Sequence, residues 1–314
     1  MTYHKPRILL TGAAGFIGFH LQKALQADAD LVLFDSLMAH QVASQIRAKK
    51  LNNLQTQLTD QQLEAILKDV DCIIHLAAET GISRSAKEPE IYIENNISFT
   101  MRLLAAANRA GVQHFIYASS SSVYAPYSGE VKETADTQNQ LSFYGTTKKM
   151  MEQLVAAYAA QSGLKAIGLR FFTVYGSWTR PDMAAYKFMQ SISKQQAITI
   201  YNPQQLQRDF THVSDIVRAI SGLLHQIASL QEGQHEIFNI GFGSPIYVRD
   251  FAQQIASALG QPLILGAGVL PNNEALHTHS NSQKLRDFIG FQPTVAAEQG
   301  IHEMVEWFKT QPYG

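Results

Sequence analysis

The chain is poor in cysteine and close to neutral in charge. Its 314 residues include one cysteine, Cys72, so no intrachain disulfide can form. Cys72 lies in an apolar run, residues 72–74, where a small buried thiol is a better interpretation than a reactive one. The formal net charge is −1, and charged residues make up 16% of the chain. This balance gives no basis for binding nucleic acid or an anionic membrane surface.

Long apolar runs are also lacking. No run reaches the roughly 18 residues that a membrane-spanning helix needs. The first residues show no apolar core or cleavage site of a secretory signal. Hydrophobic residues make up 46% of the chain, which is enough for one large core or for a core and a smaller lobe. We therefore expect a soluble, cytoplasmic protein.

A glycine-rich loop stands between the first expected strand and the first expected helix. Residues 7–11 contain a short apolar run typical of a buried parallel strand, and three glycines follow at three-residue spacing. Such a loop turns tightly, lets the backbone approach a pyrophosphate and aims a helix N-terminus at the anion. An ordinary turn is the alternative, but the place in the chain favours a dinucleotide site. The residues expected to line it are Gly12, Gly15, Phe16, Ile17 and Gly18.

An acidic residue ends the next expected strand, residues 31–34. Asp35 comes 35 − 18 = 17 residues after the last glycine of the loop, close to the spacing of about 20 in dinucleotide-binding units. A carboxylate here accepts hydrogen bonds from the ribose hydroxyls of NAD and repels the extra phosphate of NADP. A plain solvated aspartate is the alternative. We expect NAD as the cofactor.

Two later strand ends supply further candidates. Residues 71–78 end in small side chains, which let a cofactor lie close, and His75 within them is better interpreted as a packed histidine than as a ligand. Four serines, residues 119–122, follow a strand expected at 114–118. Ligands bind at the carboxyl ends of parallel strands, so we interpret the serines as hydroxyls that face the cofactor. The expected cofactor contacts at the first strand end are Leu76, Ala77 and Ala78.

Strands and helices alternate over the first 170 residues, which predicts an α/β fold with a doubly wound, Rossmann-like parallel sheet. One long helix is expected over residues 91–110, ending at Gly111. The other later segments expected are strands at 165–172, 209–213 and 237–241, and helices at 144–161, 247–259 and 296–309. The alternation breaks near Gly176. We expect an NAD-binding domain of about residues 1–175 and 209–243, and a smaller C-terminal substrate-binding lobe of about 176–208 and 244–314.

Tyr144 and Lys148 are the candidate catalytic pair. Their i, i+4 spacing at the start of an expected helix puts both side chains on one face. A phenol titrates near 10, and a neighbouring ammonium or a positively charged nicotinamide would lower that pKa. The pair would then form a proton acceptor for a hydroxyl group.

These motifs, in this order, resemble the extended short-chain dehydrogenase/reductase family of nucleotide-sugar epimerases and dehydratases. The resemblance covers nearly the whole chain. The stretch 170–183, with Thr173 and the run Arg-Pro-Asp-Met from Arg180, is similar to the UDP-glucuronate 4-epimerases. The resemblance implies a catalytic set of Ser120, Tyr144 and Lys148, with NAD as cofactor. The substrate-binding residues that it implies are Ser121, Ser122, Thr173, Arg180, Tyr201 near the uracil, and Arg208 at the diphosphate.

The chemistry that the resemblance implies is epimerisation at carbon 4. Tyr144 would take the proton of the 4-hydroxyl while NAD takes the hydride, and the 4-keto sugar would turn over before reduction on its other face. A 4-keto uronic acid is a β-keto acid, which loses carbon dioxide when its carboxylate bond aligns with the carbonyl. Arg180 and Thr173 could hold the carboxylate out of that alignment. A surface salt bridge for Arg180 and a strand-end hydroxyl for Thr173 are the alternatives.

Related dehydratases and decarboxylases carry acids where this chain has Ser121 and Ser122, which argues against those reactions. Several other positions depart from the epimerase pattern and bear on the adenine pocket and the sugar contacts. They are Gln57, Ser83, Arg84, Ala125 and residues 270–273, among them Asn272. A neutral UDP-glucose/UDP-galactose epimerase and a non-catalytic NAD-binding protein remain alternatives. By resemblance we expect a homodimer formed through the helices near 91–110 and 144–161.

Overall fold

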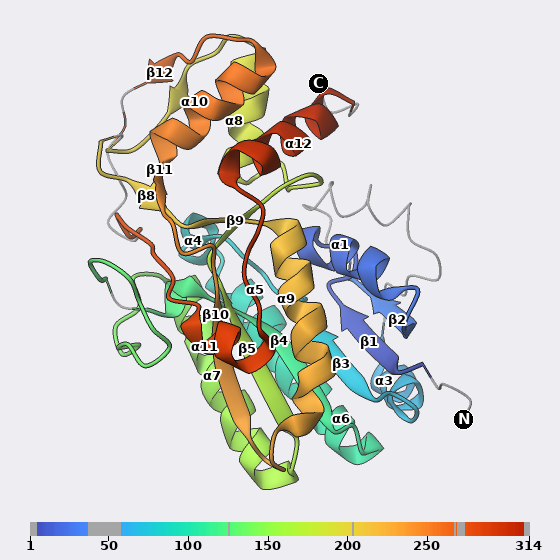
Figure 1. Ribbon diagram of the computed structural model, residues 1–314. Coiled ribbons are helices and arrows are strands. Elements are labelled where there is room, and N and C mark those ends of the chain that lie inside the picture. Colours follow the sequence, from blue (N-terminus) through green and yellow to red (C-terminus); the bar gives the residue numbers. More distant parts are fainter. Residues whose placement is uncertain are drawn as a thin grey trace.

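The computed structural model describes residues 5–36, 58–124, 126–202, 204–266, 268 and 274–310 (Figure 1). Its strands are β1 Arg7–Thr11, β2 Asp30–Phe34, β3 Cys72–His75, β4 His114–Ser120, β5 Lys165–Phe171, β6 Thr173–Tyr175, β7 Ile198–Thr199, β8 Gln207–Arg208, β9 Phe210–His212, β10 His235–Ile240, β11 Ile246–Tyr247 and β12 Leu265–Gly266. Its helices are α1 Phe16–Leu25, α3 Asp60–Leu67, α4 Ile82–Ser85, α5 Pro89–Ile93, α6 Phe99–Ala110, α7 Phe143–Ser162, α8 Ala184–Ser193, α9 Val213–Gln226, α10 Val248–Leu259, α11 Gln283–Ile289 and α12 Ala297–Lys309.

Six parallel strands form the central sheet in the order β10-β5-β4-β3-β1-β2. From β1 the chain moves outward to β2, then crosses to β3 and continues in the other direction. This reversal between β1 and β3 is a topological switch point, where open α/β sheets bind ligands at the carboxyl ends of their strands. The predicted doubly wound parallel fold is confirmed.

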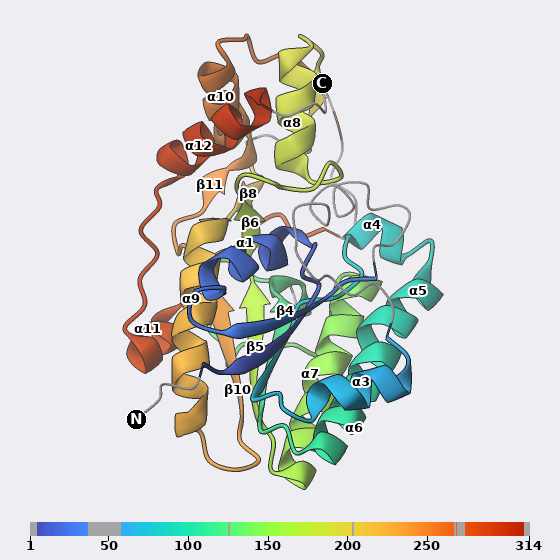
Figure 2. The ribbon, with the colours of Figure 1, turned by 90° about the vertical axis from the view of Figure 1, so that its right-hand side faces the viewer.

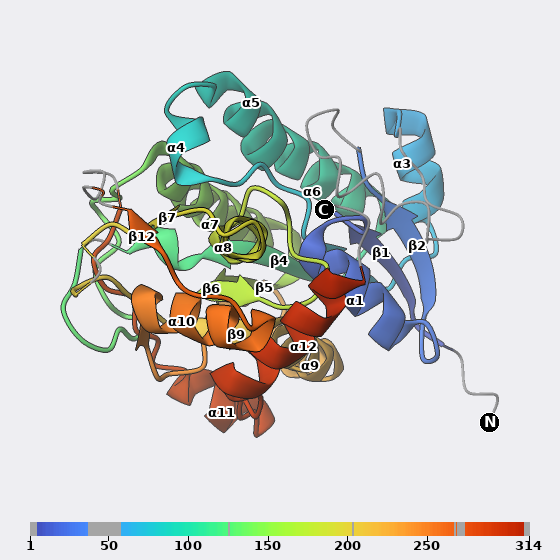
Figure 3. The same ribbon diagram turned by 90° about the horizontal axis from the view of Figure 1, so that it is seen from above.

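Alternating apolar side chains give each strand two buried faces. In β1, Ile8 and Leu10 join the core beneath α1 and α9, whereas Leu9 joins the core beneath α3, α6 and α7. Figures 2 and 3 show these two groups of helices on opposite faces of the sheet. A strand covered on both sides needs the near-continuous apolar runs seen in the sequence. Cys72 is buried in the first of these cores, as expected.

A third apolar core lies beyond the carboxyl ends of the strands, where α8, α10 and α12 pack together (Figure 1). Phe210 of β9 stacks on Phe251 of α10, with ring centroids 3.9 Å apart. Tyr175 of β6 also belongs to this core and lies edge-on to Phe251. These contacts join the upper helices to strands that continue from the central sheet. The predicted division into two domains stays a prediction.

The single helix expected over residues 91–110 is wrong in detail. A π-helical turn, Glu94–Ser98, separates α5 from α6, and the helix ends at Gly111, which has φ 77°. The extra residue in the turn points Asn96 inward. Its side chain accepts a hydrogen bond from the backbone nitrogen of Glu79 and donates one to the carbonyl oxygen of Glu79. Sequence analysis also missed α8, α9 and α11. No helix within the described ranges is both long and apolar enough to cross a bilayer.

Candidate active site

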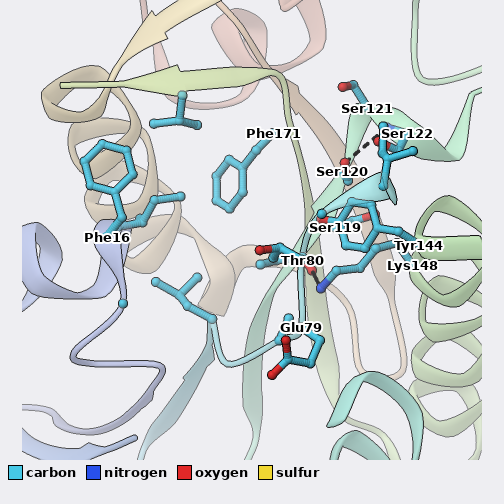
Figure 4. A pocket seen from close by; sticks show the side chains of 18 of the residues that line it. Phe16, Glu79, Thr80, Ser119, Ser120, Ser121, Ser122, Tyr144, Lys148 and Phe171 are labelled. Atoms are coloured by element: carbon cyan, nitrogen blue, oxygen red, sulfur yellow. Dashed lines mark hydrogen bonds between the residues drawn. The ribbon is translucent and has the colours of Figure 1, made fainter. Parts of the chain in front are cut away.

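A cleft of about 610 Å³ opens at the carboxyl ends of β1, β3 and β4. It adjoins a second cavity of about 960 Å³ that extends beneath α8. The two share residues from the sheet, from α7 and from the upper segments, so they form one continuous space. The shared lining residues that the argument uses are Glu79, Thr80, Tyr144, Thr173, Arg180 and Arg208. Figure 4 shows the centre of this cleft.

The glycine loop is shaped by close backbone contacts. Gly12 has φ 73°, and a Cβ on it would lie 2.6 Å from the backbone nitrogen of Ala77. A Cβ on Gly18 would lie 2.1 Å from the carbonyl oxygen of Gly12. Glycine is therefore required at both positions, and the loop stays flat against the strand ends. Gly15, Phe16 and Ile17 line the same cleft at the start of α1, where a pyrophosphate would meet a helix N-terminus.

Asp35 lies beside this loop at the end of β2. Its Oδ2 accepts a hydrogen bond from the backbone nitrogen of Ala14 at 3.0 Å, and the residue is 8% exposed. It also lines the cleft, so it is not the solvated loop residue of the alternative interpretation. The position fits an NAD ribose, with the glycine cradle holding the neighbouring phosphates.

The end of β3 forms the floor of the cleft. Leu76, Ala77 and Ala78 line it, and their contact with the cofactor stays a prediction. His75 is buried, and its Nδ1 and Nε2 lie 2.7 Å from Thr11 Oγ1 and 2.9 Å from Thr100 Oγ1. Burial and the charge of Lys148 lower the pKa of His75 to about 3, so it is neutral at ordinary pH. The prediction of a packed histidine is confirmed.

Tyr144 and Lys148 lie in the first turns of α7 and both reach the cleft (Figure 4). Ser142 caps the helix by accepting from the backbone nitrogen of Gly145 at 3.1 Å. The backbone nitrogen of Tyr144 donates to Ser85 Oγ at 3.1 Å, which ties α7 to α4. The candidate catalytic pair thus stands on a fixed helix start at the cleft.

The prediction that Lys148 lowers the pKa of Tyr144 is wrong. Burial raises the pKa of Tyr144, while a hydrogen bond with Ser120 and the positive charge of Arg180 act in the opposite direction. Lys148 is not the cation that opposes burial. Its Nζ donates to the carbonyl oxygen of Ala118 at 2.9 Å instead. The sequence spacing placed the two side chains on one face but could not show that Lys148 is buried and bonded to the backbone.

Lys148 is itself strongly affected by burial. Lys148 is 1% exposed, and burial lowers the pKa of its ammonium group to about 7. The negative charge of Glu152 acts in the opposite direction and raises this pKa. Glu152 lies one helical turn further along α7, on the same face. A cofactor ribose placed over Lys148 would offer hydroxyl acceptors to this ammonium.

Glu152 anchors a buried network beneath the serines. It accepts from Arg170 Nε and Nη2, both at 2.8 Å, and from Ser119 Oγ at 2.6 Å. The Arg170 and Glu152 side chains are each 4% exposed. Ser119 therefore turns its hydroxyl to this network rather than to the cofactor, contrary to the interpretation of all four serines as one group. Sequence analysis missed this ion pair.

Ser120 and Ser122 form the turn that faces Tyr144. Ser120 Oγ accepts from the backbone nitrogen of Ser122 at 3.1 Å and is also hydrogen-bonded with Tyr144. A Cβ on Gly145 would lie 2.2 Å from the carbonyl oxygen of Ser122, so α7 packs directly on this turn. Ser121 and Ser122 line the cleft, and their contact with substrate stays a prediction.

Thr173 and Arg180 reach the cleft from the other side. Thr173 opens β6 and lines both cavities. Arg180 donates from Nε to Asp182 Oδ1 at 2.9 Å and from Nη2 to Asp182 Oδ2 at 2.5 Å. Its Nη1 donates to Thr80 Oγ1. Arg180 thus makes the alternative salt bridge and lines the cleft near Tyr144 at the same time.

The second cavity, of about 960 Å³ and called the outer cavity from here on, is lined by the residues expected around the nucleotide. Tyr201 lines the outer cavity, and Arg208 lines both. Arg208 Nη2 lies 3.4 Å from Glu274 Oε2, and burial lowers the pKa of Arg208. Arg84, one of the departures, donates to Glu79 Oε2 at 2.9 Å and to Glu88 Oε2 at 2.7 Å. Ser83 lines the outer cavity, whereas Gln57, Ala125 and residues 270–273 lie outside the described residues.

Glu79 and Thr80 are cleft residues that sequence analysis missed. They directly follow the small residues at the end of β3, and that position was the signal available in the sequence. Figure 4 shows both side chains at the cleft near Lys148. Glu79 is 3% exposed, and its pairing with Arg84 depends on contacts that no local pattern reveals.

Comparison with known proteins shows the family to which the chain belongs. Residues 8–241 match the model of the "NAD dependent epimerase/dehydratase family". The chain is 33% identical to Protein CapI of Staphylococcus aureus, covering 96% of this chain and 98% of that protein. It is 35% identical to UDP-glucuronate 4-epimerase 6 of Arabidopsis thaliana, covering 97% and 72%.

A solved structure is also similar. The UDP-glucuronic acid 4-epimerase from Bacillus cereus, in complex with UDP-glucuronic acid and NAD, is 29% identical with a TM-score of 0.86. The match covers 96% of this chain and 99% of that one. With the glycine cradle, Asp35 and the Tyr144–Lys148 helix in place, this chain belongs to the NAD-dependent epimerase/dehydratase family and is an NAD-dependent nucleotide-sugar 4-epimerase that is similar to the UDP-glucuronate 4-epimerases.

Proposed function

We propose that this enzyme interconverts UDP-glucuronate and UDP-galacturonate through a 4-keto intermediate. The observation that carries the proposal is the position of Arg180, which lines both cavities together with Thr173 and Tyr144 and whose charge lowers the pKa of Tyr144. A cation in the same cavity as the base can hold a carboxylate on carbon 5 while carbon 4 reacts. The names of the Arabidopsis and Bacillus relatives support the same substrate pair.

Tyr144 is proposed to take the proton of the 4-hydroxyl, helped by its hydrogen bond with Ser120. When bound, NAD supplies the acceptor and donor of the hydride at carbon 4. Ser120 would then donate to the developing carbonyl oxygen. Lys148 would hold the cofactor ribose, and its charge would favour the phenolate form of Tyr144 once ribose hydroxyls stabilise the ammonium.

The outer cavity is proposed to hold the UDP part of the substrate. Arg208 lines both cavities, where it could bind the diphosphate, and Tyr201 offers a ring to the uracil. A homodimer and a cytoplasmic location stay part of this proposal.

The test is proton NMR of UDP-glucuronate incubated with the purified protein and NAD. New UDP-galacturonate signals without a UDP-pentose are expected. A UDP-pentose as the main product would mean that the carboxylate is not held and that the enzyme decarboxylates its substrate. Conversion of UDP-glucose alone would move the assignment to a neutral-sugar epimerase.

The carboxylate contact has its own test. Arg180→Ala should reduce kcat/KM for UDP-glucuronate by roughly 10-fold or more beyond any loss on UDP-glucose, because a hydrogen-bonded charge pair contributes about 1.5–3 kcal/mol. Steady-state kinetics on both sugars measures the difference. Equal losses on the two substrates would assign Arg180 to the Asp182 salt bridge alone.

A further inference from the structure

Thr80 holds the guanidinium of Arg180 from the opposite side of the cleft. Its Oγ1 accepts a hydrogen bond from Arg180 Nη1, although the residues are 100 positions apart in the sequence. We propose that Thr80 is a positioning residue that fixes Arg180 against the sugar carboxylate and thereby protects the 4-keto intermediate from decarboxylation. The inference rests on the proposed function and adds a residue that controls which product leaves the enzyme.

Thr80 stands on a rigid turn. The hydroxyl of Tyr92 donates to the carbonyl oxygens of Thr80 at 2.7 Å and of Gly81 at 2.8 Å. Asn96, in the π-helical turn, accepts from the backbone nitrogen of Glu79 at 2.8 Å and donates to its carbonyl oxygen at 3.1 Å. Tyr92 and Asn96 are both fully buried. The backbone of Thr80 is therefore held on each side by groups that cannot move into solvent.

Arg180 has a second partner that is less rigid. The Asp182 carboxylate accepts hydrogen bonds from Nε and Nη2 of Arg180. The Asp182 side chain is nevertheless 60% exposed. Each terminal nitrogen carries two hydrogens, so Nη1 and Nη2 each keep one after the contacts with Thr80 and Asp182. These remaining hydrogens are available to a substrate carboxylate. Thr80 is half-buried and stands on a backbone held by buried groups, so it supplies the fixed contact, while Asp182 orients the plane of the guanidinium.

The same frame also positions the catalytic base. The ring of Tyr92 lies edge-on to that of Tyr144, with centroids 6.3 Å apart. Asn96 Nδ2 donates to Thr147 Oγ1 of α7 at 3.1 Å. The segment that holds Thr80 therefore also contacts the helix that carries Tyr144. The distance between the carboxylate-binding Arg180 and the base is consequently set through one buried unit.

The chemistry makes this distance important. In a 4-keto uronic acid the bond from carbon 5 to the carboxylate can break, releasing carbon dioxide while its electron pair forms an enolate with the 4-carbonyl. Carbon 5 then takes a proton, and the product is a UDP-4-keto-pentose. The bond breaks only when it aligns with the carbonyl π system, so an Arg180 that can swing would allow the carboxylate to rotate into that alignment.

The experiment compares Thr80→Val, which keeps the shape but removes the hydroxyl, with Thr80→Ser, which keeps the hydroxyl. Proton NMR measures the ratio of UDP-pentose products to UDP-galacturonate formed from UDP-glucuronate. Thr80→Val should raise this ratio by roughly tenfold or more, the effect expected from losing one hydrogen bond to a charged group. Thr80→Ser should give a product ratio close to that of the enzyme without substitutions.

Thr179→Val is the matched control, because Thr179 precedes Arg180, is 2% exposed and does not line the cleft. It should leave the product ratio unchanged, with thermal melting used to confirm that all variants fold. An unchanged ratio in Thr80→Val, or an equal rise in Thr80→Ser, would overturn the proposal.

Binding provides a second measurement that separates this inference from the proposed function. Calorimetric titration should show weaker binding of UDP-glucuronate to Thr80→Val, with binding of UDP-glucose unchanged. Equal weakening of both would also overturn the role of Thr80. If the enzyme without substitutions binds UDP-glucuronate but does not epimerise it, that result would instead contradict the proposed function.

Discussion

At the scale of single residues, Tyr144 carries the proposed chemistry, and the bond from its backbone nitrogen to Ser85 holds it at the start of α7. Its side chain is half-buried and lines the cleft, which suits a group that exchanges protons with a bound substrate. Because burial raises its pKa, the phenolate must be stabilised by what binds beside it.

Replacing Tyr144 by Phe should lower turnover by about 10²–10⁴-fold, the usual contribution of a general acid–base group. The ring remains, so the contact with Tyr92 and the folding of α7 should be preserved. Turnover of UDP-glucuronate and binding of NAD by calorimetry give the two measurements. Survival of turnover would show that another group is the base.

Lys148 predicts a pH dependence of stability. Its pKa falls from 10.5 in the unfolded chain to about 7 in the fold, so burying the charged ammonium costs the most stability below pH 7. The cost declines as pH rises from 7 toward 10.5, because the folded protein then releases the proton. Lys148→Met should therefore stabilise the nucleotide-free protein most at low pH.

The advantage of Lys148→Met should shrink by roughly 1 kcal/mol for each pH unit between 7 and 9. Urea unfolding of both proteins at several pH values measures it. A difference in unfolding free energy that does not vary with pH would mean that the ammonium is not buried in its charged form.

At the scale of elements, the contact between α7 and the serine turn sets the geometry of the site. Gly145→Ala would gain about 1 kcal/mol of helix propensity, but its Cβ would meet the carbonyl oxygen of Ser122 at 2.2 Å. Overpacking of this kind costs about 1–3 kcal/mol, so a small net loss of stability is expected. The added Cβ would also push the start of α7 away from the turn that holds Ser120. We therefore expect a large fall in kcat together with this small loss of stability.

Gly222→Ala in α9 is the matched control. Its Cβ would meet only the end of the Ile289 side chain, Cδ1 at 2.9 Å, which can move. This variant should keep full activity. Melting temperature and kcat of both variants test the prediction, and equal activity in the two would show that the α7 contact does not position Tyr144.

The elements also show how far local patterns carry. β1, β4, β5 and α7 lie within a residue or two of their expected bounds, because their apolar runs and glycine boundaries are local features. The π-helical turn was not predictable, because the inward-facing Asn96 bonds to the backbone of Glu79, 17 residues away, and to Thr147 of α7. A polar residue in a helical pattern carries no sign of such a distant partner.

At the scale of the whole molecule, the site is assembled from two parts of the chain. The residues expected to bind the cofactor come from the strand ends of the sheet and from the starts of α1 and α7, whereas Arg180, Tyr201 and Arg208 come from segments that lead into the upper helices. The stacking of Phe210 on Phe251 ties these segments together. Substrate binding across the cleft should therefore stabilise the protein as one unit.

The expected homodimer is a whole-molecule prediction. Large apolar side chains are exposed on the helices expected at the interface: Ile93 of α5 is 37% exposed, and Phe143 and Met150 of α7 are 36% and 38% exposed. Met150→Glu should convert the dimer to a monomer in light scattering. Leu265→Glu, at an equally exposed apolar residue of β12, should not. A dimer that survives Met150→Glu would place the interface elsewhere.

The fold class, NAD as the cofactor, and the candidate residues of the cofactor site and the catalytic pair could all be predicted from the sequence. Each depends on local spacing: glycines between a strand and a helix, an acid at the next strand end, and two side chains one helical turn apart. The tertiary structure decided the pairing of Arg180 with both Thr80 and Asp182, the bond of Lys148 to Ala118, and the raised pKa of Tyr144. These features arise from burial and from contacts between distant residues, and neither leaves a periodic pattern in the chain.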